Sequence, residues 1–132
     1  MKKITENNKN LGTNFEREFC KILKEKGYWA HFIEPNKTGG QPFDIIACKN
    51  GSVIAFDCKT NKGDRFALSR IEDNQELAFV TFSACGNNNC YIAVKNENGI
   101  YLLNATDMIW QKRIGTKSVR LQEKWKLSYQ IK

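Results

Sequence analysis

The sequence predicts an α/β fold, with a central β-sheet flanked by helices, and three observations support this. Two segments, around residues 13–26 and 69–85, repeat apolar residues at helical spacing. Short apolar runs bounded by Gly, Asn and Pro are typical of strands. In two of these runs, residues 45–47 and 53–56, every position is apolar. Strands that are apolar on both faces are usually covered by helices on both sides.

Length and charge restrict the class of protein further. The chain has 132 residues and a formal net charge of +7, so we expect one domain over residues 1–132 that is large enough to bury a core. Between residues 112 and 132 there are seven Lys or Arg residues and one acidic residue. A basic segment of this kind commonly binds nucleic acid, although it can also be a solvated tail.

Five cysteines without a C-x-x-C pair are typical of a protein with reduced thiols. No apolar run is long enough to span a bilayer. We therefore expect a cytoplasmic protein that does not bind membranes.

The first elements follow from local patterns. Residues 1–10, rich in Asn and Lys, are expected to form a flexible basic arm. Thr13 and Glu16 fit a capping box, which predicts a helix from Thr13 that ends at Gly27. Glu16 projects into the apolar side of this helix, where a carboxylate needs a cation or a donor. The capping box would supply a donor, so both a structural and a functional role for Glu16 are open. A strand over residues 28–33 and a polar loop over 34–41 follow.

Asn50-Gly51 joins two apolar runs, and this is the strongest short-range signal of a β-hairpin, because both central residues of a type I′ turn need positive φ. If these two residues form the loop, Lys49 pairs with Ser52. The same register places Asp44 directly opposite Asp57.

Two aspartates facing each other across a hairpin repel, because like charges directly opposite destabilise a sheet. A cation between them removes the repulsion, and paired carboxylates with few other ligands suit Mg²⁺ or Mn²⁺. Lys59 shares the face of Asp57, since strand side chains alternate. Asp44 and Asp57 therefore predict a metal site beside a lysine. The alternative is that both are solvated residues at strand ends.

After the hairpin, residues 60–68 form a polar, basic loop. Ser69 and Glu72 fit a second capping box, which opens a helix closed by Gly86. Gln75 lies in the apolar stripe of this helix, either as a hydrogen-bonded core residue or as a functional one. Strands are expected at residues 90–95 and 100–104, and a short helical turn near 107–110.

From Val119 to Ile131, apolar residues occupy most odd positions and polar residues the even ones. This alternation predicts a long strand with one apolar and one basic face. The apolar face would either hold two subunits together or complete the core of its own subunit.

The order of these residues resembles a known superfamily. Glu16 on a helix is followed by Pro42-Phe43-Asp44, then by Asp57-Cys58-Lys59, then by Gln75 on a second helix. This resembles the PD-(D/E)xK nucleases, with Phe43 as an extra residue in the first half-motif. Within them the chain most resembles the small Holliday-junction resolvases of the RecU and Hjc types, over roughly residues 12–95. The resemblance implies a mixed central β-sheet flanked by helices, a restriction-endonuclease-like nuclease core.

The resemblance also implies roles for single residues. Asp44 and Asp57 would ligate a divalent metal, Mg²⁺ or as a substitute Mn²⁺, together with the backbone carbonyl of Cys58. Lys59 would orient or activate the attacking water, or offset charge on the phosphate. The same comparison implies that Glu16 binds a metal through water or holds a second metal, and that Gln75 positions water or phosphate. Family members usually carry Glu at the position of Asp57.

We therefore expect a Mg²⁺-dependent endonuclease that cleaves branched DNA, specifically a homodimeric Holliday-junction resolvase acting on four-way junctions in recombination and DNA repair. Two alternatives are a nuclease of the same superfamily that cuts flap or duplex DNA, and a catalytically inactive DNA-binding relative. The expected DNA contacts are four basic residues, Lys37, Lys62, Arg65 and Arg70.

Overall fold

The computed structural model describes residues 2–35 and 41–131. The strands are β1 (Trp29–Phe32), β2 (Ile45–Lys49), β3 (Ser52–Thr60), β4 (Arg65–Ala67), β5 (Cys90–Asn96), β6 (Gly99–Asn104) and β7 (Ser118–Arg120). The helices are α1 (Lys2–Glu25), α2 (Asp73–Ala84), α3 (Ala105–Arg113) and α4 (Leu127–Gln130), with two short 3-10 helices, η1 (Leu68–Arg70) and η2 (Glu123–Trp125). Within the described part of the chain, no helix is long and apolar enough to cross a membrane.

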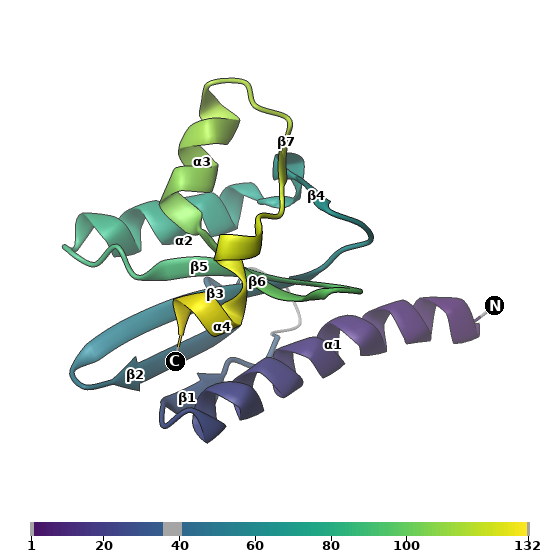
Figure 1. Cartoon of the computed structure of the whole chain (residues 1–132), viewed down its shortest axis with the longest axis horizontal. Helices are drawn as coiled ribbons and strands as arrows, with labels where there is room; N and C mark the ends of the chain where they lie inside the picture. The colour runs from purple at the N-terminus through teal and green to yellow at the C-terminus, as the bar shows by residue number, and fades with distance from the viewer. Residues whose placement is uncertain (1, 36–40, 132) are drawn as a thin grey trace.

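A five-stranded sheet in the order β1-β2-β3-β5-β6 forms the centre of the fold (Figure 1). β3 and β5 are parallel, whereas the other neighbours are antiparallel. The expected mixed sheet is therefore confirmed. A separate two-stranded ribbon joins β4 to β7.

Helices cover both faces of the sheet, with one hydrophobic core on each. On the first face α1 buries Phe19 and Leu23, and the ring of Phe19 meets that of Phe56 edge to face at 5.0 Å. On the second face Phe79 of α2 and Ile109 of α3 are buried. Because β3 contributes to both cores, its continuous apolar run is explained.

Two helices start elsewhere than predicted. α1 begins at Lys2 rather than Thr13, so residues 2–10 are helical and not a flexible arm. Extending a helix from a packed segment is far easier than nucleating one, so a polar sequence can continue it. α2 begins at Asp73 with Glu72 as its N-cap, and Ser69 belongs instead to η1. The expected loop over residues 60–68 also contains β4.

The predicted long strand over residues 119–131 is wrong, because this segment consists of the end of β7, then η2 and α4. Its apolar side chains do not share one face. Leu121 and Trp125 pack on the core beneath α2, whereas Leu127 and Ile131 pack on the core beneath α1. Leu127 and Ile131 are four residues apart, which matches a helical turn. The segment therefore completes the core of its own subunit.

Candidate active site

The β2–β3 hairpin positions both aspartates of the predicted site. Asn50 and Gly51 have φ angles of 52° and 79°, as the predicted turn requires. The strands pair in the predicted register from the turn to the level of Phe56. Asp44 and Asp57 are the next residues beyond this ladder, and they are only 7% and 3% exposed. Two carboxylates are thus buried at one end of the hairpin.

Asp44 is held by the backbone of β3. Its Oδ2 accepts a hydrogen bond from the Cys58 N–H at 2.8 Å, and its own N–H donates to the Phe56 carbonyl at 2.9 Å. Burial, followed by the nearby charges of Asp44 and Asp57, raises the pKa of the Cys58 thiol well above its ordinary value. Cys58 therefore contributes to the site through its backbone and not as a thiolate.

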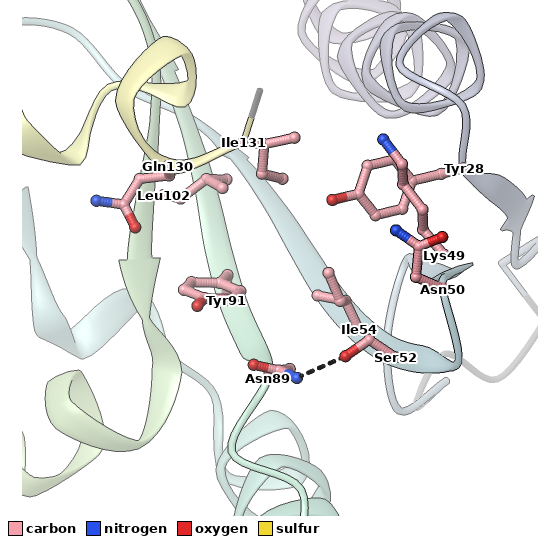
Figure 2. A pocket seen from close by; sticks show the side chains of 10 residues that line it. All are labelled: Tyr28, Lys49, Asn50, Ser52, Ile54, Asn89, Tyr91, Leu102, Gln130 and Ile131. Atoms are coloured by element: carbon pink, nitrogen blue, oxygen red, sulfur yellow. Dashed lines mark hydrogen bonds between the residues drawn. The ribbon is translucent and has the colours of Figure 1, made fainter.

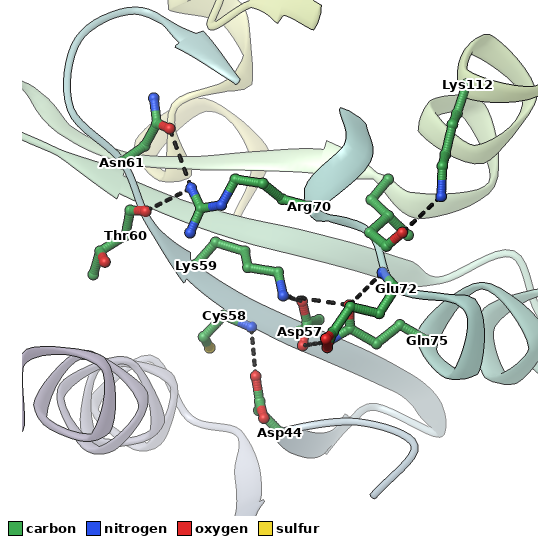
Figure 3. A network of polar contacts seen from close by, with 11 residues as sticks. Asp44, Asp57, Cys58, Lys59, Thr60, Asn61, Arg70, Glu72, Gln75 and Lys112 are labelled. Atoms are coloured by element: carbon green, nitrogen blue, oxygen red, sulfur yellow. Dashed lines mark hydrogen bonds and ion pairs between the residues drawn. The ribbon is translucent and has the colours of Figure 1, made fainter. Parts of the chain in front are cut away.

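Asp57, Lys59 and Gln75 contact one another, although Gln75 belongs to a helical pattern and the other two to the predicted hairpin (Figure 3). The Lys59 Nζ lies 3.2 Å from Oδ2 of Asp57. Gln75 Nε2 donates to the other oxygen of Asp57 at 2.8 Å, and Lys59 Nζ donates to Gln75 Oε1 at 3.3 Å. Asp57 and Lys59 therefore face α2, and Gln75 links the helix to both.

The N-cap of α2 is part of this arrangement, which the sequence analysis missed. Gln75 Oε1 also accepts a hydrogen bond from the Glu72 N–H at 3.1 Å, as half of a capping box between these two residues. Glu72-x-x-Gln75 has capping-box spacing in the sequence, but Ser69-x-x-Glu72 overlaps it and begins with serine, which is a better N-cap than glutamate. The same side chain thus starts the helix and orients the site.

Glu16 adds a third carboxylate from α1. Burial raises its pKa to about 7, and the charge of Asp44 adds to the rise, whereas Lys59 and Arg17 oppose it. Glu16 is therefore within electrostatic range of Asp44 and Lys59. Since α1 begins well before Thr13, the capping-box explanation for Glu16 is wrong.

The carboxylates are in an environment that favours a neutralising cation. Burial raises the pKa of Asp57 to about 8; Lys59 opposes this rise and Asp44 adds to it. In the described residues, no group of three or more His, Cys, Asp or Glu side chains is arranged so that it could hold a metal ion. Asp57 is turned toward Lys59 and Gln75. The available donors are carboxylate oxygens, which Mg²⁺ prefers, so Asp44 and Asp57 fit the expected metal by the chemistry of their donor atoms.

The four predicted DNA contacts differ in their surroundings. Lys37 lies outside the described residues. Lys62 and Arg65 are exposed after β3, and Lys62 lines a cavity of about 500 Å³ with residues of α1 and β5. Arg70 is half-buried, and its Nη1 donates to the Thr60 carbonyl at 2.7 Å. Arg70 therefore stabilises the end of β3 through this hydrogen bond.

A second cavity, of about 460 Å³, lies at the opposite end of β3 beside the hairpin turn (Figure 2). Tyr28 and Lys49 stand on one side of it, and Gln130 and Ile131 on the other. None of its lining residues is Asp, Glu, His or Cys. The carboxylate end of the hairpin is therefore the better candidate for metal-assisted chemistry.

A family model described as archaeal Holliday junction resolvase (Hjc) matches residues 7–130, nearly the whole chain. The chain belongs to this family. The crossover junction endodeoxyribonuclease Hjc of Methanocaldococcus jannaschii is 30% identical to it over 93 residues. The crossover junction endodeoxyribonuclease Hje of Saccharolobus solfataricus is 27% identical over 75 residues.

The alignments with these Hjc and Hje relatives cover 70% and 56% of this chain, and 65% and 56% of the relatives. The chain thus spans just under two thirds of one relative and little more than half of the other. The solved structure of Archaeoglobus fulgidus Hjc, a Holliday junction resolvase from an archaeal hyperthermophile, matches with a TM-score of 0.58 and 24% identity. That match covers 72% of this chain and 78% of the other, and it supports the shared fold.

Asp44→Asn and Asp57→Asn should leave the free energy of unfolding without divalent metal unchanged, or raise it by about 1 kcal/mol. Above pH 8, where Asp57 is ionised, each substitution removes one charge from a buried group of carboxylates that repel. Denaturant titration in a chelating buffer measures the effect, with Asp73→Asn, an exposed carboxylate on α2, as the matched control. A loss above about 2 kcal/mol for both buried variants would contradict the repulsion.

Proposed function

We propose that this protein is a metal-dependent endonuclease that hydrolyses phosphodiester bonds in branched DNA, in particular in four-way junctions. The observation that carries the proposal is the buried pair Asp44 and Asp57 beside Lys59. Membership of the Hjc family supports the choice of substrate. The M. jannaschii relative is named a crossover junction endodeoxyribonuclease, which points to the same reaction class.

Asp44, Asp57 and the backbone carbonyl of Cys58 would hold Mg²⁺, with Mn²⁺ as a substitute. Bound there, the metal ion would act as a Lewis acid on the phosphate and lower the pKa of water. The residues fit because they supply hard oxygen donors and because both carboxylates are buried together.

The remaining side chains would act on the water and the phosphate. Lys59 carries a positive charge that Asp57 and Gln75 hold in place, so it can offset charge on the phosphate or orient the attacking water. Glu16, with a pKa near 7, can accept a proton at neutral pH. Gln75 would keep Asp57 and Lys59 aligned as the substrate enters.

Two other functions differ in testable ways. A nuclease of the same superfamily that cuts flap or duplex DNA would use the same residues, so only a comparison of DNA substrates separates it. A catalytically inactive DNA-binding relative would bind junctions without cutting them. The contacts among Asp57, Lys59 and Gln75 argue against the inactive form, because they assemble the side chains that the reaction needs.

Purified protein should cut a four-way junction in the presence of Mg²⁺, in preference to linear duplex and flap DNA of the same sequence. Asp44→Asn and Asp57→Asn should each reduce the single-turnover rate by at least about a thousandfold, because each removes a metal ligand. Mg²⁺ should raise the melting temperature of the wild type and of Asp73→Asn, but not of either site variant. Cleavage by both site variants at the wild-type rate would refute the metal site.

Neutralising Lys62 and Arg65 together should weaken binding to every DNA form, because phosphate contacts are independent of sequence and branching. The slope of log K against log salt should become less steep by about 2. Fluorescence anisotropy over a salt series measures both quantities. The double variant Lys21→Gln, Lys24→Gln, on the exposed side of α1, loses the same charge and is the control. An unchanged slope would place the DNA elsewhere.

We also propose a homodimer, because two opposed strands of a junction must be cut and one subunit offers one site. The apolar residues after β7 pack inside the subunit, so the contact between subunits must use another surface. Trp29 and Val53 flank Cys48 across β1, β2 and β3, and they are 62% and 38% exposed. This row of side chains is our candidate for the contact between subunits.

Sedimentation at micromolar concentration should show a dimer, and Trp29→Glu should convert it to a monomer, because a charge would be buried in an apolar contact. Tyr129→Glu changes another exposed aromatic residue, 60% exposed, and should remain dimeric. A wild-type monomer with and without junction DNA would rule out the dimer.

A further inference from the structure

The β4–β7 ribbon carries two arginines directly opposite each other. Arg65 pairs with Arg120 in the antiparallel ladder. The side chain of Arg120 is 68% exposed, and Arg65 is exposed as well. Like charges in this position destabilise a sheet, and Asp64, 3.5 Å from Arg120, offsets only part of the charge. The Arg65 guanidinium donates to the hydroxyl and carbonyl of Ser118, whereas the Arg120 guanidinium lies beside Asp64. The ribbon therefore presents two separate cations on one face, which suits an anionic partner.

The ribbon is rigidly anchored on its inner face and open on its outer face. Phe66 is fully buried, and Leu121, just beyond β7, is 6% exposed. Both belong to the core beneath α2. On the outer face the neighbours of the arginine pair are Ala67 and Ser118, which pair with each other. Ser118 accepts hydrogen bonds from the Arg65 guanidinium at 3.2 and 3.1 Å, so the arginine is held on the outer face.

The outer face continues into a cavity of about 490 Å³. Its lining includes the hydroxyl side chains of Ser69, Thr116 and Ser118 and the exposed Lys117. No acidic residue lines it. Hydroxyl, ammonium and guanidinium groups are the donors that proteins use for phosphate oxygens of DNA. The Thr116 hydroxyl already donates to Gln111 Oε1, so the cationic groups are the main donors here. The cavity and the arginine pair share Ala67 and Ser118, so together they offer one continuous anion-binding site.

The ribbon has a fixed position relative to the candidate active site. Arg70, in η1 directly after β4, donates to the carbonyl of Thr60, the residue that follows Lys59. Arg70 also lies over the ring of Phe66 at 5.4 Å from its centroid. A strand of DNA held on the ribbon would thus keep a constant distance from Lys59.

We propose that the outer face of the β4–β7 ribbon, with the cavity beside it, binds the sugar-phosphate backbone of a duplex arm of the DNA substrate. Arg120 and Lys117 are the new phosphate contacts, and Arg65 acts with them. The inference rests on the proposed function, and it gives the basic stretch after α3 a defined role in positioning DNA. Duplex DNA is the occupant because basic and hydroxyl side chains line this surface, and none of the residues lining the cavity is an aromatic that could stack on unpaired bases.

Arg120→Gln and Lys117→Gln should each weaken binding of linear duplex and of four-way junction DNA by about three- to tenfold. Each should also make the salt dependence less steep by about 1. Each substitution should raise the DNA concentration needed for half-saturation. The single-turnover rate at saturating DNA should stay unchanged. Lys124→Gln, in the same basic stretch but on η2, is the matched control and should bind within about twofold of wild type.

Asp64→Asn separates DNA contact from a structural role. If Arg120 only held the ribbon through Asp64, Asp64→Asn would weaken DNA binding as Arg120→Gln does. If Arg120 contacts phosphate, removing the competing carboxylate should tighten binding about twofold or more. Glu123→Gln removes the same charge from an ion pair with Lys126 on another element, and it should leave binding unchanged.

Three results would overturn the inference. If Arg120→Gln and Lys117→Gln both bind DNA as tightly as the wild type, the ribbon does not contact DNA. This result would not contradict the proposed cleavage activity. An equal loss of affinity for Lys124→Gln would show that the effect depends on net charge and not on contacts at the ribbon. A loss confined to single-stranded DNA would reject the duplex arm. If the wild type neither binds nor cuts junction DNA, the proposed function itself fails.

Discussion

The two-residue turn at Asn50-Gly51 is the constraint on which the candidate site depends. It sets the register of β2 against β3, and a slip of one residue would send every side chain of one strand to the opposite face. Asp57 and Lys59 would then leave α2, and Phe56 would leave the core beneath α1. Because β3 is packed on both faces, the two cores hold the register that the turn selects.

The helices around the sheet also supply the polar partners of the site. Among the described residues, no buried side-chain nitrogen or oxygen lacks a hydrogen-bond partner. Asp44 is satisfied by the backbone of β3, and Asp57 by Lys59 and by Gln75 from α2. Glu16 adds negative charge from α1. The carboxylates are thus individually hydrogen-bonded and collectively repulsive, which is the electrostatic condition that a divalent cation would relieve.

Local patterns in the sequence predicted the parts of the fold whose structure is decided locally. The turn, the hairpin register, the two strands after α2 and the face shared by Asp57 and Lys59 all follow from residues close in the chain. The predicted first residues of α1 and α2 were wrong, because helix ends depend on what the rest of the helix packs against.

The side-chain contacts of Gln75 could not be predicted, since they depend on how α2 lies across β3. The segment after β7 was misread for a similar reason. Its alternation is genuine, but Trp125 and Ile131 are assigned to different cores by the path of the chain. Periodicity reports which residues are apolar, and only the tertiary structure decides which core receives them.

The packing of residues 125 and 131 on different cores brings the chain between them to one edge of the sheet. Since Trp125 lies with one core and Ile131 with the other, the chain between them passes around the outside of β6. Lys126 forms a single antiparallel bridge with Tyr101 of β6, and its ammonium lies 5.9 Å from the centre of that ring. An uncovered border strand invites strand addition from another molecule and hence aggregation. The segment at Lys126 therefore covers part of the β6 edge and leaves fewer of its backbone groups open to strand addition.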